Sequence, residues 1–423
     1  MEPCHVAPQG DVPAFSFESQ AGQLIKVGLA LSSTRALGDL LEMVLLEARK
    51  LTGADAGSVY LVDGNVLRFE TSQNGTLSER LGEAACRALF KAYELPLNAQ
   101  SIAGYVAVSK EMLNIPDVYA IDPSAPYHFN PASDRANDYS THSMLSLPMM
   151  DQKDEVVGVL QLINATRETA EGRRVVPFNP MCLPVVGALA SQAAVAIVNA
   201  KLTMALQKSW LDSMLRLGLA AEYRDKETAN HITRVSEYAL LLGRNLGMDK
   251  NGLELLHWGA AMHDTGKLGI PDSILHKPGL LSTEERATME YHTLIGALIL
   301  KGDSNPILKA SQSVALTHHE RWDGNGYPRK LAGEAIPLFG RITALVDVFD
   351  ALSSRRVYKP AFPMEKVVQI LGEEQGKHFD PTLVDILFAN LDEADAIRTT
   401  HADTEADFEK FRNYSLLKIE DVL

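Results

Sequence analysis

Helical and strand-like patterns of apolar residues alternate along the first part of the chain. Between residues 39 and 51 apolar side chains recur at helical spacing, and Gly53 stands where such a helix would end. Two pairs of strand-like runs follow, at 58–62 with 66–70 and at 144–150 with 156–164. Gly64 allows the positive φ that a tight hairpin turn needs between the first two runs. These patterns predict an α+β module.

From about residue 183 the pattern becomes helical and stays so for most of the remaining chain, which predicts a change of fold class. We therefore expect a multidomain protein in which a long helix joins the α+β domain to an all-α bundle. The expected parts are a loose leader (1–21), the α+β domain (22–182), the connecting helix (183–219), the helical bundle (220–400) and a C-terminal helix or tail (401–423).

The connecting helix carries a stripe of mostly apolar or small residues at alternating steps of three and four. Its members are Ile197, Ala200, Met204, Gln207, Leu211, Met214 and Gly218. Such a stripe could seat a parallel copy of the same helix and so form a homodimer. Because it is shorter than three to four heptads, we favour a helix packed on its own domain and keep the homodimer as the alternative.

The composition is that of a globular protein with an acidic balance. The 423 residues include 40 Lys+Arg and 54 Asp+Glu, a net charge of −14, which argues against a nucleic-acid polymer or an anionic membrane as partner. Three scattered cysteines form no CxxC motif, which is typical of the reducing cytoplasm. The most apolar window, 185–200, contains three polar residues, and we expect it to be too short and polar to cross a bilayer.

Histidines and carboxylates recur at intervals of 26 to 32 residues in the helical half. They are His231, His263-Asp264, His292, His318-His319 and Asp347. A single His on a helix is more often a hydrogen-bonded core residue than a ligand. Burying neighbouring polar groups, however, costs several kcal/mol unless something coordinates them, so a metal cluster built by a helical bundle is the simpler explanation. Imidazole and carboxylate without thiolate suit Fe, Mn, Zn or Ni.

Residues 225–360 also resemble the HD-GYP branch of the HD phosphohydrolases. The resemblance is carried by HDTGK at 263–267, HHERWDGNGYP at 318–328 and DVFDAL at 347–352. It implies an all-helical domain that hydrolyses cyclic di-GMP to pGpG, GMP or both with two or three divalent metal ions, iron being favoured and manganese the alternative. The family's ligand positions are matched by His231, His263, Asp264, His292, His318, His319 and Asp347.

Further residues receive roles beside these ligands. Glu227 precedes His231 by four residues, so on a helix both share one face, and the resemblance makes Glu227 the ligand of a third ion. Asp264 is the expected bridging carboxylate, positioned to hold two ions that activate one water. Lys267 would offset charge that develops on the phosphoryl oxygens. By resemblance, Arg356 and Lys359 are candidates for binding the substrate phosphates.

The glycine-rich loop from Trp322 to Pro328 is expected to form one wall of the site. Its last three residues, Gly326, Tyr327 and Pro328, give the family its name, and by resemblance this loop is also a candidate contact for diguanylate cyclase domains.

Residues from about 22 to 200 look like a GAF domain, a small-ligand sensing fold with a central antiparallel sheet. They are closest to the GAF domains of cyclic-nucleotide phosphodiesterases, whose dispersed Asn-Lys-Phe-Asp-Glu motif accompanies nucleotide binding. Asn164 and Phe178 fit that motif, but Ala165 replaces Lys, and the Asp and Glu are not evident. The GAF ligand is therefore unknown, and a dimer scaffold without a ligand is an equal alternative.

The sequence leaves three functions to compare. The first is a GAF-regulated cyclic di-GMP phosphodiesterase in the cytoplasm. The second is a hydrolase of another cyclic dinucleotide such as cyclic GMP-AMP, and the third is a catalytically silent nucleotide receptor. An altered His-Asp pair would favour the silent receptor, but His263 and Asp264 are both intact.

Overall fold

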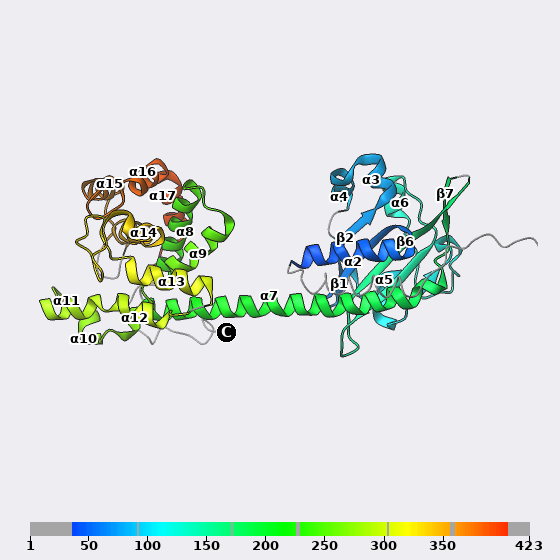
Figure 1. Ribbon diagram of the computed structural model, residues 1–423, viewed down its shortest axis with the longest axis horizontal. Helices are drawn as coiled ribbons and strands as arrows, with labels where there is room; N and C mark the ends of the chain where they lie inside the picture. Colours follow the sequence, from blue (N-terminus) through cyan, green and yellow to red (C-terminus); the bar gives the residue numbers. More distant parts are fainter. Residues whose placement is uncertain are drawn as a thin grey trace, which may run out of the picture. The chain divides into compact units, whose positions relative to one another are not determined.

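The computed structural model describes residues 36–90, 93–170, 172–225, 229–302, 304–355 and 360–404. Two compact units meet in sequence between Gln207 and Lys208 (Figure 1). The expected leader, 1–21, lies outside the described residues. The other boundaries drawn from the sequence stay predictions.

The first unit is built on one antiparallel sheet with the strand order β3-β2-β1-β6-β5-β4, and β7 also pairs with β6. The strands are β1 (Ala54–Asp63), β2 (Val66–Asn74), β3 (Glu94–Pro96), β4 (Leu113–Ile115), β5 (Met144–Met150), β6 (Val156–Thr169) and β7 (Gly172–Val176). Both hairpins predicted from strand-like runs are confirmed; β1, β2 and β6 are longer than predicted, and β5 has the predicted bounds. Gly64, in the first turn, has the positive φ that the sequence predicts.

Helices cover the two faces of this sheet. The helix predicted over 39–51 is α2 (Leu37–Thr52), which ends at Gly53 in the left-handed conformation. Together with the start of α7 (Leu183–Asp225), α2 packs on the face that Val59 and Leu61 of β1 present. The alternate residue Tyr60 faces the opposite side, where α5 (Ile102–Ser109) packs. The remaining short elements are α3 (Gly75–Leu81), α4 (Glu83–Leu89), η1 (Val118–Ala120), α6 (Ala132–Asn137) and η2 (Pro180–Cys182).

The connecting helix, α7, is longer than predicted, with 43 residues that run on to Asp225. Ile197 and Met214 are buried in the cores of the first and second unit, respectively, whereas Met204 is 56% exposed and all of residues 202–209 are exposed. The interpretation that the whole stripe packs on its own domain is therefore wrong for its middle. Each core covers only one end of the helix.

The prediction that the apolar window 185–200 is too short and polar to span a membrane is also wrong. That window is part of one continuous helix, which by length and composition alone is apolar enough to cross a bilayer. In the structure 44% of its most apolar stretch is buried. Val186, Leu189 and Ala193 are fully buried in the core of the first unit, so packing accounts for part of this apolar character.

The second unit is helical throughout its described residues, as the sequence predicts for an all-α bundle. Its elements are α8 (Ala229–Asn245), α9 (Lys250–Ala261), η3 (Thr265–Gly269), α10 (Asp272–Leu275), α11 (Thr283–Glu290), α12 (His292–Ile299), α13 (Pro306–Thr317), η4 (Gly333–Ala335), α14 (Leu338–Ser353), α15 (Met364–Glu373), α16 (Pro381–Ala389) and α17 (Leu391–Thr400). Its main core joins α8, α9 and α14–α17 around Tyr238, Leu256 and Phe349.

Candidate functional site

The histidines and acids that the sequence singles out converge in the second unit, most of them at helix ends. His231 lies in the first turn of α8, His263-Asp264 follow α9, His292 begins α12, His318-His319 follow α13, and Asp347 lies on α14. The structure brings all of them except Asp347 into two adjacent groups, and within each group the ligand atoms lie within 4.8 Å of one another. One group is Asp264, His292, His318 and His319; the other is His231, His263 and an acid that the sequence analysis missed, Glu222.

Two carboxylates, Asp264 and Asp347, lie beside the imidazoles of these groups. Asp264 Oδ1 lies 3.5 Å from His292 Nε2 and 3.6 Å from His318 Nε2, while its Oδ2 lies 3.1 Å from His263 Nε2. Asp347 Oδ1 lies 3.6 Å from His231 Nε2. A single side chain, Asp264, thus faces both groups, which is the geometry that a bridging carboxylate needs.

Backbone carbonyls fix the orientation of the imidazole rings. The Nδ1 atoms of His263 and His292 donate to the carbonyls of Ala260 (2.8 Å) and Met289 (2.7 Å). His318 Nδ1 lies 3.1 Å from the carbonyl of Val314. Because a carbonyl can only accept, each Nδ1 carries a proton, and each Nε2 faces the centre.

These buried groups fit a metal centre because several of their polar atoms have no hydrogen-bond partner in the described part of the chain. His263 Nε2, Asp264 Oδ1 and Glu222 Oε2 are buried without a hydrogen bond among the described residues. Such atoms are rare in folded proteins, and a bound ion is one accepted reason for them. The donor set of imidazole nitrogen and carboxylate oxygen suits divalent transition metals.

The histidines of the centre differ in the direction in which their pKa values are shifted. Burial lowers the pKa of His292 to about 4 and that of His319 well below its usual range, so both rings are neutral. Burial also opposes the charged form of His263, but the neighbouring carboxylates Asp264 and Asp347 outweigh it and raise the pKa of His263 to about 10. Negative charge therefore surrounds His263, where a cation would be stabilised.

Lys267 enters the same centre. Its Nζ lies 2.6 Å from Asp264 Oδ2 and 2.5 Å from Asp225 Oδ2, at the end of α7. Close packing of η3 against α12 holds it there: a Cβ on Gly266 would meet the carbonyl oxygen of His292 at 1.8 Å, so this position requires glycine.

The loop from Trp322 to Pro328 packs on the metal-ligand candidates. The Tyr327 ring lies 4.9 Å from that of His319 at an interplanar angle of 31°, and the Tyr327 amide donates to the His319 carbonyl. Gly326 is needed because a Cβ there would lie 2.3 Å from the amide nitrogen of Arg321. Tyr327 thus covers one side of the His319 ring.

Sequence reasoning assigned no role to two further acids of the centre, Asp350 and Glu222. Asp350 accepts a hydrogen bond from His231 Nδ1 (2.8 Å) and two from Arg234. Asp350 follows Asp347 by three residues on one helix, and that spacing within an apolar run was the available signal. For Glu222 the signal was an acid beside Leu219, Ala220 and Ala221. Three predicted residues, Glu227, Arg356 and Lys359, lie outside the described part of the chain.

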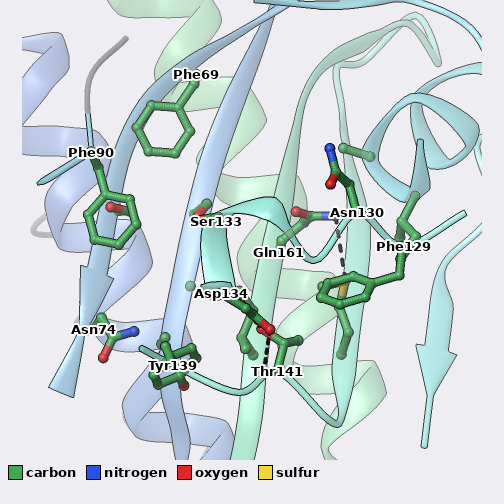
Figure 2. A pocket seen from close by; sticks show the side chains of 18 of the residues that line it. Phe69, Asn74, Phe90, Phe129, Asn130, Ser133, Asp134, Tyr139, Thr141 and Gln161 are labelled. Carbon is green, nitrogen blue, oxygen red and sulfur yellow. Dashed lines mark hydrogen bonds between the residues drawn. The ribbon is translucent and has the colours of Figure 1, made fainter. Parts of the chain in front are cut away.

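A separate cavity of about 360 Å³ lies in the first unit (Figure 2). Phe69 and Phe90 stand on one side of it, and Phe129 and Asn130 lie across from them. Asp134 also lines the cavity, but its carboxylate accepts from the amide of Thr141 (2.7 Å) and from its hydroxyl (3.0 Å). Among the described residues, no Lys or Arg side chain lines this cavity.

Comparison with known proteins assigns both units. The GAF domain family matches residues 36–197, and the HD domain family matches residues 205–383. A 3′3′-cGAMP-specific phosphodiesterase 2 of Vibrio cholerae is 40% identical over 205 residues, which are 48% of this chain and 39% of that protein.

Two further relatives carry a different substrate in their names. A cyclic di-GMP phosphodiesterase of Vibrio cholerae is 47% identical over 191 residues, which are 42% of this chain and 39% of that protein. The cyclic di-GMP phosphodiesterase response regulator RpfG of Xanthomonas campestris is 44% identical over 176 residues, 42% of this chain and 47% of that protein. The chain thus spans less than half the length of these relatives.

Proposed function

Because the chain carries a GAF domain and an HD domain, we propose that it is a metal-dependent phosphodiesterase that hydrolyses cyclic di-GMP to pGpG, GMP or both. The observation that carries this proposal is the pair of adjacent, buried ligand groups that Asp264 faces with both carboxylate oxygens. The proposed enzyme acts in the cytoplasm.

Each residue of the centre has a proposed part in the reaction. Asp264, His292, His318 and His319 would hold one ion and His231, His263 and Asp347 a second, with iron favoured over manganese. Divalent ions bound there activate water and neutralise charge on a phosphodiester. Asp264 sets the separation of the two positions, and Lys267 places an ammonium group where phosphoryl charge grows. Arg356 and Lys359 are proposed to bind the phosphates, and Glu227 a third ion.

The hydrolysis test uses the full chain. We expect protein loaded anaerobically with Fe²⁺ or Mn²⁺ to convert cyclic di-GMP to pGpG or GMP, as resolved by chromatography. Asp264→Ala should abolish turnover and lower metal content, whereas His257→Ala should change neither, because His257 belongs to neither ligand group. Fully metal-loaded protein without turnover, or equal losses in both variants, would refute the proposal.

Cyclic GMP-AMP is the second candidate substrate, because a relative of comparable similarity is named for it. The same assay with 3′3′-cyclic GMP-AMP decides between them. We expect the larger kcat/KM for cyclic di-GMP, and a tenfold preference for cyclic GMP-AMP would reverse the assignment.

We also propose that the GAF cavity binds a small uncharged ligand with a flat ring. Phe69 and Tyr93 are stacked with centroids 5.0 Å apart and supply an aromatic wall. The described lining contains no Lys or Arg that could bind a phosphate. Calorimetry on the full chain should show adenosine or guanosine binding in preference to cyclic AMP or cyclic GMP, and Phe69→Ala should weaken it. Tighter binding of the cyclic nucleotides would contradict this.

Two protein contacts complete the proposal. The loop around Gly326, Tyr327 and Pro328 is proposed to contact diguanylate cyclase domains, and the chain is proposed to form a homodimer through α7. Exposed apolar residues on α7 support the second contact.

A further inference from the structure

Glu222, like Asp264, is a buried acid with a carboxylate oxygen that has no hydrogen bond among the described residues. It lies one turn before the end of α7 and is only 2% exposed. Its Oε2 is buried and has no hydrogen-bond partner among the residues that the structure describes. An oxygen of this carboxylate lies within 4.8 Å of a ring nitrogen of both His231 and His263.

An ionised carboxylate in such a place needs a cation. Burial disfavours its charge, by several kcal/mol for an uncompensated ion. Among the described residues, Lys267 is the lysine whose charge acts on Glu222, and it is already engaged by Asp225 at 2.5 Å and by Asp264 at 2.6 Å. The imidazoles of His231 and His263 are the other neighbours, and both are metal-ligand candidates themselves.

We infer that Glu222 is a direct ligand of the ion held by His231 and His263. The inference rests on the proposed metal centre and adds a residue to it. With Asp347 of the proposed centre, Glu222 gives this ion two imidazoles and two carboxylates, a ligand set that suits iron(II) and, for a six-coordinate ion, leaves positions open for water and substrate. Glu222 completes this set from α7, whereas His231 and His263 come from α8 and from the end of α9.

The position of this ligand gives α7 a second role. The same continuous helix begins in the core of the GAF unit, where Val186 and Leu189 are fully buried, and ends with Glu222 and Asp225 in the metal centre. A shift of α7 along or about its axis therefore moves one metal ligand and the partner of Lys267 together.

Metal content tests the inference with a readout besides activity. Glu222→Gln keeps the size of the side chain and removes its charge, and Asp212→Asn on an exposed turn of the same helix is the matched control. By elemental analysis after reconstitution, we expect Glu222→Gln to lose about one ion per chain relative to wild type. Asp212→Asn should bind as many ions as wild type.

Thermal unfolding separates a ligand from a structural acceptor. Without metal, Glu222→Gln should melt no lower than wild type, because a buried charge is gone, while metal should raise its Tm by less than it raises that of wild type. A structural acceptor would give the reverse: a lower Tm without metal and an unchanged number of ions. That result would overturn the inference.

Two further results keep the inference separate from the proposed function. If Glu222→Gln does not fold, Glu222→Asp replaces it, because aspartate keeps the charge on a shorter side chain. We expect Glu222→Asp to bind metal about tenfold more weakly than wild type. Wild-type affinity in that variant would overturn the inference. Wild-type protein that binds no metal would overturn the proposed centre as a whole, whereas a loaded wild type with an equally loaded Glu222→Gln would overturn only the role of Glu222.

Discussion

Asp350 is a buried acid that orients His231 in the proposed metal centre. Its carboxylate accepts from His231 Nδ1, from Nε and Nη2 of Arg234 at 2.6 and 2.9 Å, and from the hydroxyl of Ser354. Burial opposes its ionisation, but the bonds from His231 and Arg234 outweigh burial and hold the pKa of Asp350 well below its usual range. Asp350 is therefore ionised, and it keeps the His231 proton on Nδ1 with Nε2 toward the site.

Asp350→Asn should weaken metal binding without removing a ligand. The amide loses the charge that orients His231 and leaves Arg234 with one buried carboxylate fewer, so we expect metal affinity to fall about 10- to 100-fold. Stability should fall by about 3 kcal/mol, the range for breaking a buried ion pair. Competition with a metal-binding dye measures the first effect and urea unfolding the second.

Asp392→Asn, at an exposed position on α17, is the control for Asp350→Asn and should change neither quantity. Wild-type metal affinity in Asp350→Asn would show that His231 is oriented by other contacts.

At the scale of elements, the centre depends on how closely η3 approaches α12. The approach places Lys267 beside Asp264 and has room only for glycine at position 266. Gly266→Ala should therefore push η3 away from His292. We expect a loss of about 3 kcal/mol in the free energy of unfolding, together with reduced metal content, because overpacking shifts the backbone on which the ligands sit.

Gly372→Ala is the matched control for Gly266→Ala. Gly372 lies on α15 of the same unit, and an added Cβ would meet nothing closer than 3.9 Å. This variant should be as stable as wild type or up to about 1 kcal/mol more stable, since alanine favours a helix. Equal stability of both variants, measured by denaturant unfolding, would show that η3 can move to accommodate the added Cβ without loss of unfolding free energy.

The sequence predicted those parts of the fold and site that repeat at a regular period. Strand-like runs on either side of a turn placed both hairpins, and the similar spacing of His263, His292 and His318 predicted the convergence of helix ends. Glu222 could not be found this way, because it lies nine residues before His231 on a different helix. The same limit applied to α7, since periodicity shows which residues share a face but not which tertiary surface covers that face.

At the scale of the whole molecule, α7 leaves an apolar surface between the cores of the two units. Leu202 is 62% exposed and Leu206 is 72% exposed, and their spacing of four puts them on one side of the helix. The predicted stripe runs along the other side, where Ile197 and Met214 are already buried in their own units. A second copy of α7 is therefore expected to cover Leu202 and Leu206 in the proposed homodimer.

Replacing both leucines with lysine tests this contact. Leu202→Lys with Leu206→Lys should place like charges opposite one another and convert dimer to monomer, by light scattering at one fixed protein concentration. Metal content should stay at the wild-type level, because neither residue lies in the metal centre. Met204→Lys, about half a turn away, should leave the dimer intact. If Met204→Lys alone dissociates the dimer, the contact runs along the predicted stripe instead. If the wild-type chain is itself monomeric, the proposed homodimer through α7 is wrong.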